Sequence, residues 1–322
     1  MKKRILTLTI VTTLTAVVQL TNASPKNFRQ AKILTKEHVY FDRTKQGTIY
    51  CGCNWSWAGE SGGRVDHKSC GYQVRAIPNR AIRIEYEHVT PISHVAHQRQ
   101  CWKSGGRKNC NKVDPVFNYI EADMHNLDIA VGEVNADRSA YRFGLLPNAP
   151  AQHGMCESRV DFKQRVFEPR DEVKGMVARI NFYMHDAYDL KMSTQQQRLF
   201  MAWDKQFPVT SWELERDKRI AKVMGHSNEF VTGHKTWNIN HKNTGAGLAR
   251  VNALLSNDQS YSPRGSVTAP AQKGTIINAN KNSKIYHLHH CPNYNSVNPK
   301  NVIQFSSEPE AQAAGFRKAR NC

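Results

Sequence analysis

Beyond its first 23 residues, the sequence lacks any apolar run long enough to cross a membrane. A spanning helix needs about 20 consecutive apolar residues, so the mature protein is expected to have no membrane span. The sequence also lacks a Cys-x-x-Cys pair and shows no internal repeat. These absences argue against the common cysteine-rich zinc modules and against repeat architectures.

Acidic residues are scarce relative to basic ones. The 322 residues include 27 Asp and Glu but 45 Lys and Arg, which gives a formal net charge of +18 and a pI near 9.6. Such a charge favours nucleic acid or another anionic surface as a partner, although it says nothing about fold and also suits an ordinary soluble basic protein. The length allows one large domain or two.

The N-terminus has the pattern of a secretory signal peptide. Lys2–Arg4 form a charged start, Ile5–Leu20 form an apolar, threonine-rich stretch, and Thr21–Ala23 form a small-residue cleavage site. We therefore predict that residues 1–23 are removed and that the protein is periplasmic or secreted. Loss of the three N-terminal cations lowers the charge from +18 to +15, still strongly basic.

The mature chain keeps an even number of cysteines, which behind a signal peptide predicts disulfides before metal. Cys51 and Cys53 are too close to bridge each other easily, so each is expected to pair elsewhere. Cys101 and Cys110, which bracket Arg107, are expected to pair with each other. The eight disulfide candidates are Cys51, Cys53, Cys70, Cys101, Cys110, Cys156, Cys291 and Cys322.

The pattern of apolar and capping residues predicts alternating helices and strands. The alternating run from residue 81 to residue 89 predicts a strand, and residues 159–188 have helical spacing with a break at Pro169. Helices are expected to begin at Asp114, Ser193 and Thr210. Residues 235–283 are polar and glycine-containing, typical of a linker. Residues 284–322 regain the signals of two strands and a short helix that ends at Gly315.

Four residues carry the chemistry needed to hydrolyse a phosphodiester. His88 can accept a proton from water, and Glu87 with Asn135 offers the hard oxygens that suit Mg²⁺. Arg107, in a glycine-rich loop, can hold phosphate oxygens. Each also has an ordinary alternative: a structural Glu–His pair, a solvated arginine or a helix-capping asparagine.

Seven short motifs occur in an order that resembles the endonuclease I family of bacterial periplasmic and secreted nucleases. The resemblance extends from about residue 28 to about residue 230, so residues 24–234 are assigned to the nuclease domain. The motifs are Tyr50–Cys53, Ser69–Tyr72, Glu87–Val89, His97–Trp102, Gly105–Cys110, Asp123–Leu127 and Gly132–Arg138.

The resemblance implies an α+β protein with mixed helices and strands and a ββα-metal (His-Me finger) site. It implies that His88 is the general base, that Glu87 and Asn135 bind one Mg²⁺, Mn²⁺ or Ca²⁺, and that Arg107 and Glu121 complete the catalytic set. The expected substrate is DNA, with RNA as a second substrate, cut without sequence preference to leave 5′-phosphates. The basic residues expected to contact nucleic acid are Arg99, Lys108 and Arg138.

Residues 284–322 resemble a small Ada-like metal-binding module appended to some extracellular nucleases. In an oxidising compartment a Cys291–Cys322 disulfide is favoured there over zinc. We expect the mature protein to act as a monomer. The alternative to an enzyme is a basic secreted protein that binds nucleic acid or anionic cell surfaces without cleaving anything.

Overall fold

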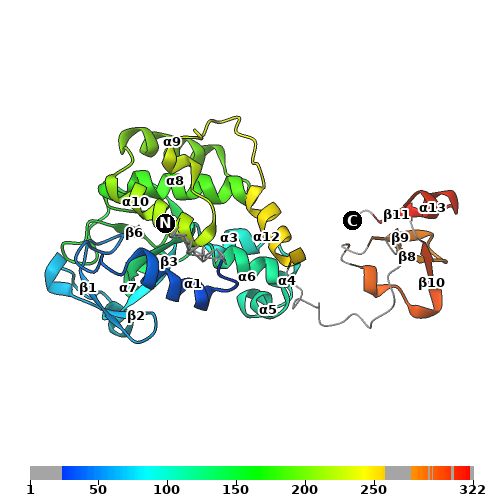
Figure 1. The fold of residues 1–322 in the computed structure, drawn as a ribbon, viewed down its shortest axis with the longest axis horizontal. Helices are drawn as coiled ribbons and strands as arrows, with labels where there is room; N and C mark the ends of the chain where they lie inside the picture. Colours follow the sequence, from blue (N-terminus) through cyan, green and yellow to red (C-terminus); the bar gives the residue numbers. More distant parts are fainter. Residues whose placement is uncertain (1–23, 258–276, 289–290, 292, 306–307, 320–322) are drawn as a thin grey trace, which may run out of the picture. The chain divides into compact units, whose positions relative to one another are not determined.

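The computed structural model describes residues 24–257, 277–288, 291, 293–305 and 308–319 (Figure 1). The chain divides into two compact units, with the boundary between Leu254 and Leu255. The predicted signal peptide, residues 1–23, and residues 258–276 of the predicted linker lie outside the described residues.

Two antiparallel strands and one helix form the centre of the first unit. Strand β3 (Ile84–His88) pairs with β4 (Leu127–Val131), and Glu87 lies opposite Asp128 in the register. Helix α7 (Gly132–Arg138) follows β4 directly. Alternate residues of the strands, including Ile84, Tyr86 and Ile129, enter a buried apolar cluster. The other side of β3 therefore carries side chains that the core does not use.

Further strands and helices surround this strand–strand–helix unit. The remaining strands of the first unit are β1 (Trp55–Ala58), β2 (Gly62–Val65), β5 (Arg142–Phe143), β6 (Arg159–Asp161) and β7 (Val166–Glu168). The helices before α7 are α1 (Phe28–Leu34), a π-helical turn (Thr35–Val39), a 3₁₀ turn (His67–Cys70), α2 (Pro78–Ala81), α3 (Ile92–Ala96), α4 (Gln100–Lys103), α5 (Gly106–Val113), α6 (Pro115–Glu121) and a 3₁₀ turn (Met124–Asn126). Those after it are α8 (Asp171–Ala187), α9 (Thr194–Gln206), α10 (Ser211–Met224), α11 (Glu229–Thr232) and α12 (Ala246–Asn257).

The predicted helix starts are confirmed at three places. The side chains of Asp114, Ser193 and Thr210 accept hydrogen bonds from backbone N–H groups at the starts of α6, α9 and α10. The helical reading of residues 159–168 is wrong, because this segment forms the antiparallel strands β6 and β7. Arg165, with a φ of +56°, lies in the turn between them, and a short strand pair cannot be distinguished from a helix by spacing alone.

The predicted linker starts too early in the sequence. Residues 235–251 are part of the first unit: Trp237 is buried and stacks on Phe182 with ring centroids 5.0 Å apart. The carboxylate of Asp186 in α8 accepts hydrogen bonds from Lys235, His241 and Thr244. A single buried indole and one buried carboxylate fix a segment whose composition is that of a loop.

The second unit has a small sheet with its own apolar core. Strands β8 (Ile277–Asn280), β9 (Ile285–His287), β10 (Val302–Phe305) and β11 (Arg317–Lys318) lie in the order β10-β8-β9-β11. Two 3₁₀ turns (Tyr294–Ser296 and Pro299–Asn301) and helix α13 (Glu308–Ala313) complete it. Ile277, Ala279 and Tyr286 are fully buried. The strands and the glycine-ended helix predicted between residues 284 and 315 are confirmed.

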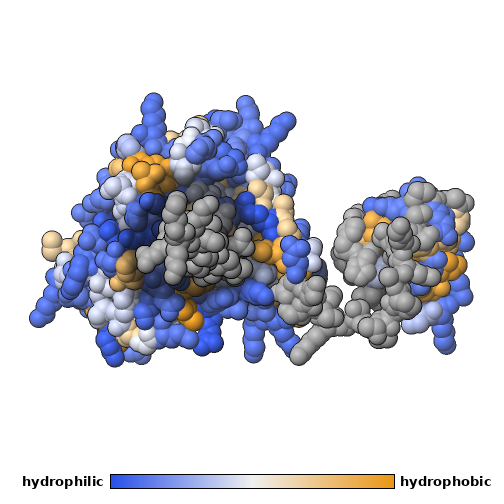
Figure 2. Space-filling view, viewed as in Figure 1, coloured by the Kyte–Doolittle hydropathy of each residue, from blue (hydrophilic) through white to orange (hydrophobic). Residues whose placement is uncertain are grey.

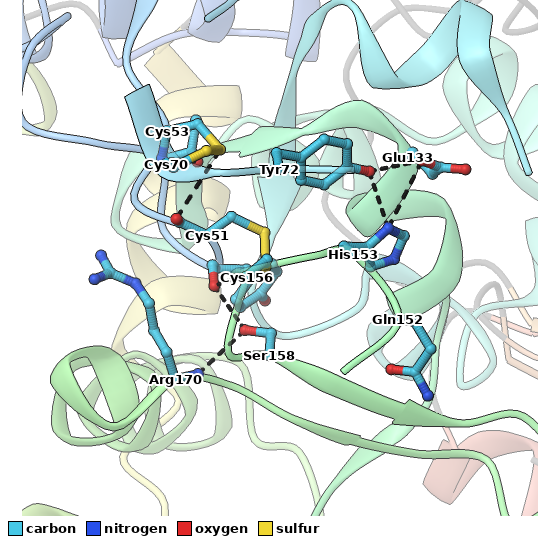
Figure 3. Close-up of a disulfide and its surroundings, with 12 residues drawn as sticks. Cys51, Cys53, Cys70, Tyr72, Glu133, Gln152, His153, Cys156, Ser158 and Arg170 are labelled. Atoms are coloured by element: carbon cyan, nitrogen blue, oxygen red, sulfur yellow. Dashed lines mark hydrogen bonds and ion pairs between the residues drawn. A yellow bond between two sulfur atoms is a disulfide. The ribbon is translucent and has the colours of Figure 1, made fainter. Parts of the chain in front are cut away.

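Three disulfides fasten the first unit. Cys51 pairs with Cys156, Cys53 with Cys70 and Cys101 with Cys110. The predictions that Cys51 and Cys53 pair elsewhere and that Cys101 pairs with Cys110 are therefore confirmed. Figure 3 shows the first two bridges side by side. Cys322 lies outside the described residues, so a Cys291–Cys322 pair stays a prediction.

The surface of the first unit is polar on the viewed face, where apolar residues form only small separate patches (Figure 2). No helix among the described residues has both the length and the apolar character required to cross a bilayer.

Candidate active site

A cleft of about 660 Å³ opens at the end of β3. Four of the residues predicted to act together, Glu87, His88, Arg107 and Asn135, line it. They come from the last two positions of β3, the first turn of α5 and the middle of α7. Arg107 was predicted in a loop but lies in a helix. Neighbouring strand residues normally point to opposite faces, and the end of β3 at His88 allows both side chains to reach one cleft.

Among the described residues, Tyr50 and Arg138 contact one of the two carboxylate oxygens of Glu87. Its Oε1 accepts a hydrogen bond of 2.8 Å from the Tyr50 hydroxyl and lies 3.0 Å from Nε of Arg138. Neither of these contacts uses Oε2. Burial raises the pKa of Glu87 to about 7, although the Arg138 guanidinium and the Tyr50 hydrogen bond act in the opposite direction. A cation at the free oxygen would keep this carboxylate ionised.

His88 has a defined tautomer. Its Nε2 lies 2.8 Å from the backbone oxygen of Glu121, and a carbonyl oxygen can only accept, so Nε2 carries the proton. In the neutral ring Nδ1 is then the acceptor. Burial lowers the pKa of His88 to about 4, partly offset by the Glu121 carbonyl. The ring is therefore neutral near pH 7 and able to take a proton.

Arg107 and His88 are both positioned by Glu121. The carboxylate of Glu121, which is 1% exposed, accepts from Nε of Arg107 and from Nδ2 of Asn111 at 3.0 Å. The Arg107 side chain is 46% exposed, so its outer nitrogens remain accessible from the cleft. The ring of Phe28 lies 4.8 Å from the His88 ring and 5.3 Å from the Arg107 guanidinium. Phe28 thus packs against both the His88 ring and the Arg107 guanidinium.

The side-chain amide of Asn135 is held through its nitrogen. Its Nδ2 donates to Oε2 of Glu85 at 3.1 Å, so its Oδ1 is not involved in that bond. Glu85 is itself held by Arg80 and Arg83. A carboxylate oxygen and an amide oxygen form a donor set that suits Mg²⁺, which keeps several water ligands. The residues present thus fit one hard divalent cation at Glu87 and Asn135.

The three residues expected to contact nucleic acid have different environments. Lys108 is exposed on α5, whereas Arg99 is partly buried and forms a two-pronged ion pair with Asp114. The prediction for Arg138 is wrong, because its side chain is fully buried beside Glu87 and its Nη2 donates to the Val89 carbonyl at 2.6 Å. A guanidinium at this position compensates the charge of a buried carboxylate and has no surface to offer a ligand.

Sequence reasoning missed three residues that shape the cleft: Phe28, Tyr50 and Glu85. Glu85 could have been found, because it lies two positions before Glu87 on the same strand face. Tyr50 opens one of the family motifs, but the contacts of Tyr50 with Glu87 and of Phe28 with His88 join residues 37 and 60 positions apart, and the sequence gives no sign of either contact. Only the folded chain brings them to the site.

Known proteins match the region of the chain that contains this cleft. The family model described as Endonuclease I matches residues 24–235. The chain is 43% identical over 209 residues to Endonuclease-1 of Buchnera aphidicola (65% of this chain, 82% of the relative). It is 46% identical over 207 residues to the periplasmic deoxyribonuclease of Aeromonas hydrophila (64% and 85%), and 48% identical over 185 residues to an extracellular deoxyribonuclease of the same organism (57% and 81%).

Proposed function

The chain belongs to the endonuclease I family, and we propose that it hydrolyses the phosphodiester bonds of DNA, with RNA as a second substrate. It is a nuclease of the periplasm or the extracellular space. The strands β3 and β4 with helix α7 act as a ββα-metal site that uses one Mg²⁺, Mn²⁺ or Ca²⁺. Cleavage has no sequence preference and leaves 5′-phosphates, and the protein acts as a monomer.

His88 acts as the general base. Nδ1, the acceptor nitrogen of the neutral ring, takes a proton from the water that attacks phosphorus. The hydrogen bond between Nε2 and the Glu121 carbonyl keeps this nitrogen available and stabilises the ring as it becomes charged. The contact between Nε2 of His88 and the Glu121 carbonyl, which leaves Nδ1 as the acceptor, is the observation that best supports the proposal.

Arg107 and the metal ligands stabilise the charge that develops on the phosphate. The Arg107 guanidinium, held by Glu121 on one edge, donates to phosphate oxygens from its exposed edge. Glu87 and Asn135 would hold the cation, which would stabilise the negative charge on the phosphate and on the leaving 3′-oxygen. Lys108 and the surplus of basic residues attract the polyanionic substrate.

A plasmid-cleavage assay with and without EDTA tests this proposal. We expect the intact protein to nick and linearise a plasmid in the presence of Mg²⁺, and we expect EDTA to stop the reaction. Binding of the plasmid without cleavage under every metal condition would support the alternative, a basic secreted protein that binds nucleic acid or anionic cell surfaces.

A further inference from the structure

The sheet of the second unit has one apolar face and one polar face. Ile277, Ala279 and Tyr286 are buried in the core, and side chains alternate along a strand. The residues between them therefore point away from the core: Asn278 and Asn280 on β8, and Ile285 and His287 on β9. Arg317 on β11 lies opposite Ile285 in the register, so it shares this polar face.

A cavity of about 710 Å³ lies over this face. Residues of the sheet form one wall, and the turn with Asn293, Ser296 and Val297 forms another. The volume is in the range of small-molecule sites, roughly 300–1,000 Å³. Neither Asp nor Glu lines the cavity among the described residues, so its polar groups are cationic or neutral.

The groups that line the cavity are suited to an anion. Arg317 is exposed and forms no ion pair with any residue that the structure describes. Oδ1 of Asn280 already accepts from the backbone N–H groups of Asn282 and Ser283, which leaves its Nδ2 donors for a ligand. Nδ1 of His287 is buried without a hydrogen-bond partner among the described residues. Such a polar atom costs free energy unless a ligand or water satisfies it.

We propose that this cavity of the second unit binds the sugar–phosphate backbone of a nucleic-acid strand, with Arg317 on the phosphate and Ile285 and Val297 against the sugar or base. The cavity is lined only by residues of the second unit and shares none of them with the cleft at the end of β3, so it is a second binding site on the chain. This proposal rests on the proposed function, because the ligand of the cavity is the nucleic acid that the nuclease unit is proposed to cleave. Bilayer phosphates share the anionic chemistry, but a planar headgroup surface fits a concave cavity less well than a single strand does.

Binding to a full-length His88→Ala protein tests this site without hydrolysis. We expect a short thymidine oligomer to shift the imidazole NMR signals of His287, and we expect Arg317→Ala to remove that shift. Arg317→Ala should also weaken oligomer binding about three- to tenfold and lower the slope of log affinity against log salt by about one. The ring signals of buried Tyr286 report whether the variant's second unit is folded.

Lys300→Ala is the matched control, because it removes one exposed charge from the same unit outside the cavity. Equal losses in the two variants, or an unmoved His287 signal at saturating oligomer, would overturn the proposal. So would a His287 shift with phosphatidylglycerol vesicles but none with the oligomer. Because these readouts need no cleavage, a failure here is separate from a failure of the plasmid assay.

Discussion

The hydroxyl of Tyr50 donates a hydrogen bond of 2.8 Å to Oε1 of Glu87, and Tyr50 directly precedes a half-cystine. Cys51 pairs with Cys156 (Figure 3), and Ser158 donates to the Tyr50 carbonyl at 2.7 Å. The disulfide and this backbone bond hold Tyr50 in place. The proposed metal ligand is thus oriented by a residue that a covalent cross-link positions.

Tyr50→Phe should weaken metal binding without unfolding the protein. Partners that orient a ligating side chain typically contribute about 10- to 100-fold in metal affinity or activity. The measurement is Mn²⁺ binding followed by its EPR signal, together with the metal dependence of cleavage. Tyr86→Phe is the matched control, because Tyr86 lines the same cleft but its buried hydroxyl has no partner among the described residues. Equal effects of the two changes would contradict the role of Tyr50.

His88→Ala should lower the cleavage rate by about 10²–10⁴-fold, the usual contribution of proton transfer, while DNA binding is retained. The rate of supercoiled-plasmid loss and a parallel filter-binding assay measure the two properties. His94→Ala serves as the control, because His94 is exposed and is outside the proposed catalytic set. Near-normal cleavage by His88→Ala would remove this residue from the role of base.

Arg138→Met should destabilise the fold rather than weaken DNA binding specifically. Removing one partner of a buried ion pair typically costs about 3–5 kcal/mol, because the other charge is left uncompensated. Lys108→Met, on the exposed face of α5, should change stability by less than about 0.5 kcal/mol and should reduce the salt dependence of DNA binding. Urea denaturation and salt titrations separate these outcomes. If both variants behave alike, the burial of Arg138 does not explain its role.

The disulfides should differ in how strongly they stabilise the protein. They close sequence separations of 105, 17 and 9 residues, and loop-closure entropy predicts about 5 kcal/mol for the first and about 3 kcal/mol for the last. Replacing Cys51 and Cys156 by alanine should therefore lower the free energy of unfolding more than replacing Cys101 and Cys110.

Reduction should also abolish cleavage, because Tyr50 and Arg107 are both held near disulfides. We expect dithiothreitol-treated protein, or protein made in a reducing cytoplasm, to be inactive and to regain activity on oxidation. Free thiols and the cleavage rate are measured in each sample, so that activity can be compared with the redox state of the cysteines. Full cleavage activity in a sample whose cysteines are all free thiols would contradict this prediction.

Asp186→Asn should loosen the segment from Lys235 to Asn257, and the effect should depend on pH. Burial acts to raise the pKa of Asp186, but the hydrogen bonds from His241, Thr244 and Lys235 outweigh it and lower the pKa. A depressed folded-state pKa stabilises the protein fully above the unfolded value of about 3.9, and this contribution disappears as the pH falls through the folded-state value.

The free energy of unfolding of the wild type should thus exceed that of Asp186→Asn by about 2 kcal/mol at neutral pH. This difference should shrink below about pH 4. Denaturation followed by Trp237 fluorescence measures it. Glu157→Gln, which neutralises an exposed carboxylate outside this segment, should show little effect at either pH. A constant difference between wild type and Asp186→Asn across this range argues against the charge as the cause.

The sequence was most informative where chemistry is local. Helix starts at Asp114, Ser193 and Thr210 follow from side chains that cap the next residues. Cys101 and Cys110, expected to pair because they bracket Arg107, do so, whereas the partners of Cys51 and Cys53 could not be chosen from the sequence. The residues of the candidate site could be named because each residue type has few chemical uses, and because their order resembles a known family.

Only the tertiary structure decided which charged residues are buried and what they contact. Arg138 and Lys108 are both basic residues in family motifs, yet one compensates Glu87 in the interior and the other is exposed. Likewise, the polar residues around Trp237 in the sequence do not distinguish this buried side chain from one in an exposed loop. Burial depends on contacts between residues distant in sequence, and neither residue type nor periodicity records those contacts. The sequence by itself thus determined the chemistry that the site can perform, whereas packing determined which side chains hold it in position.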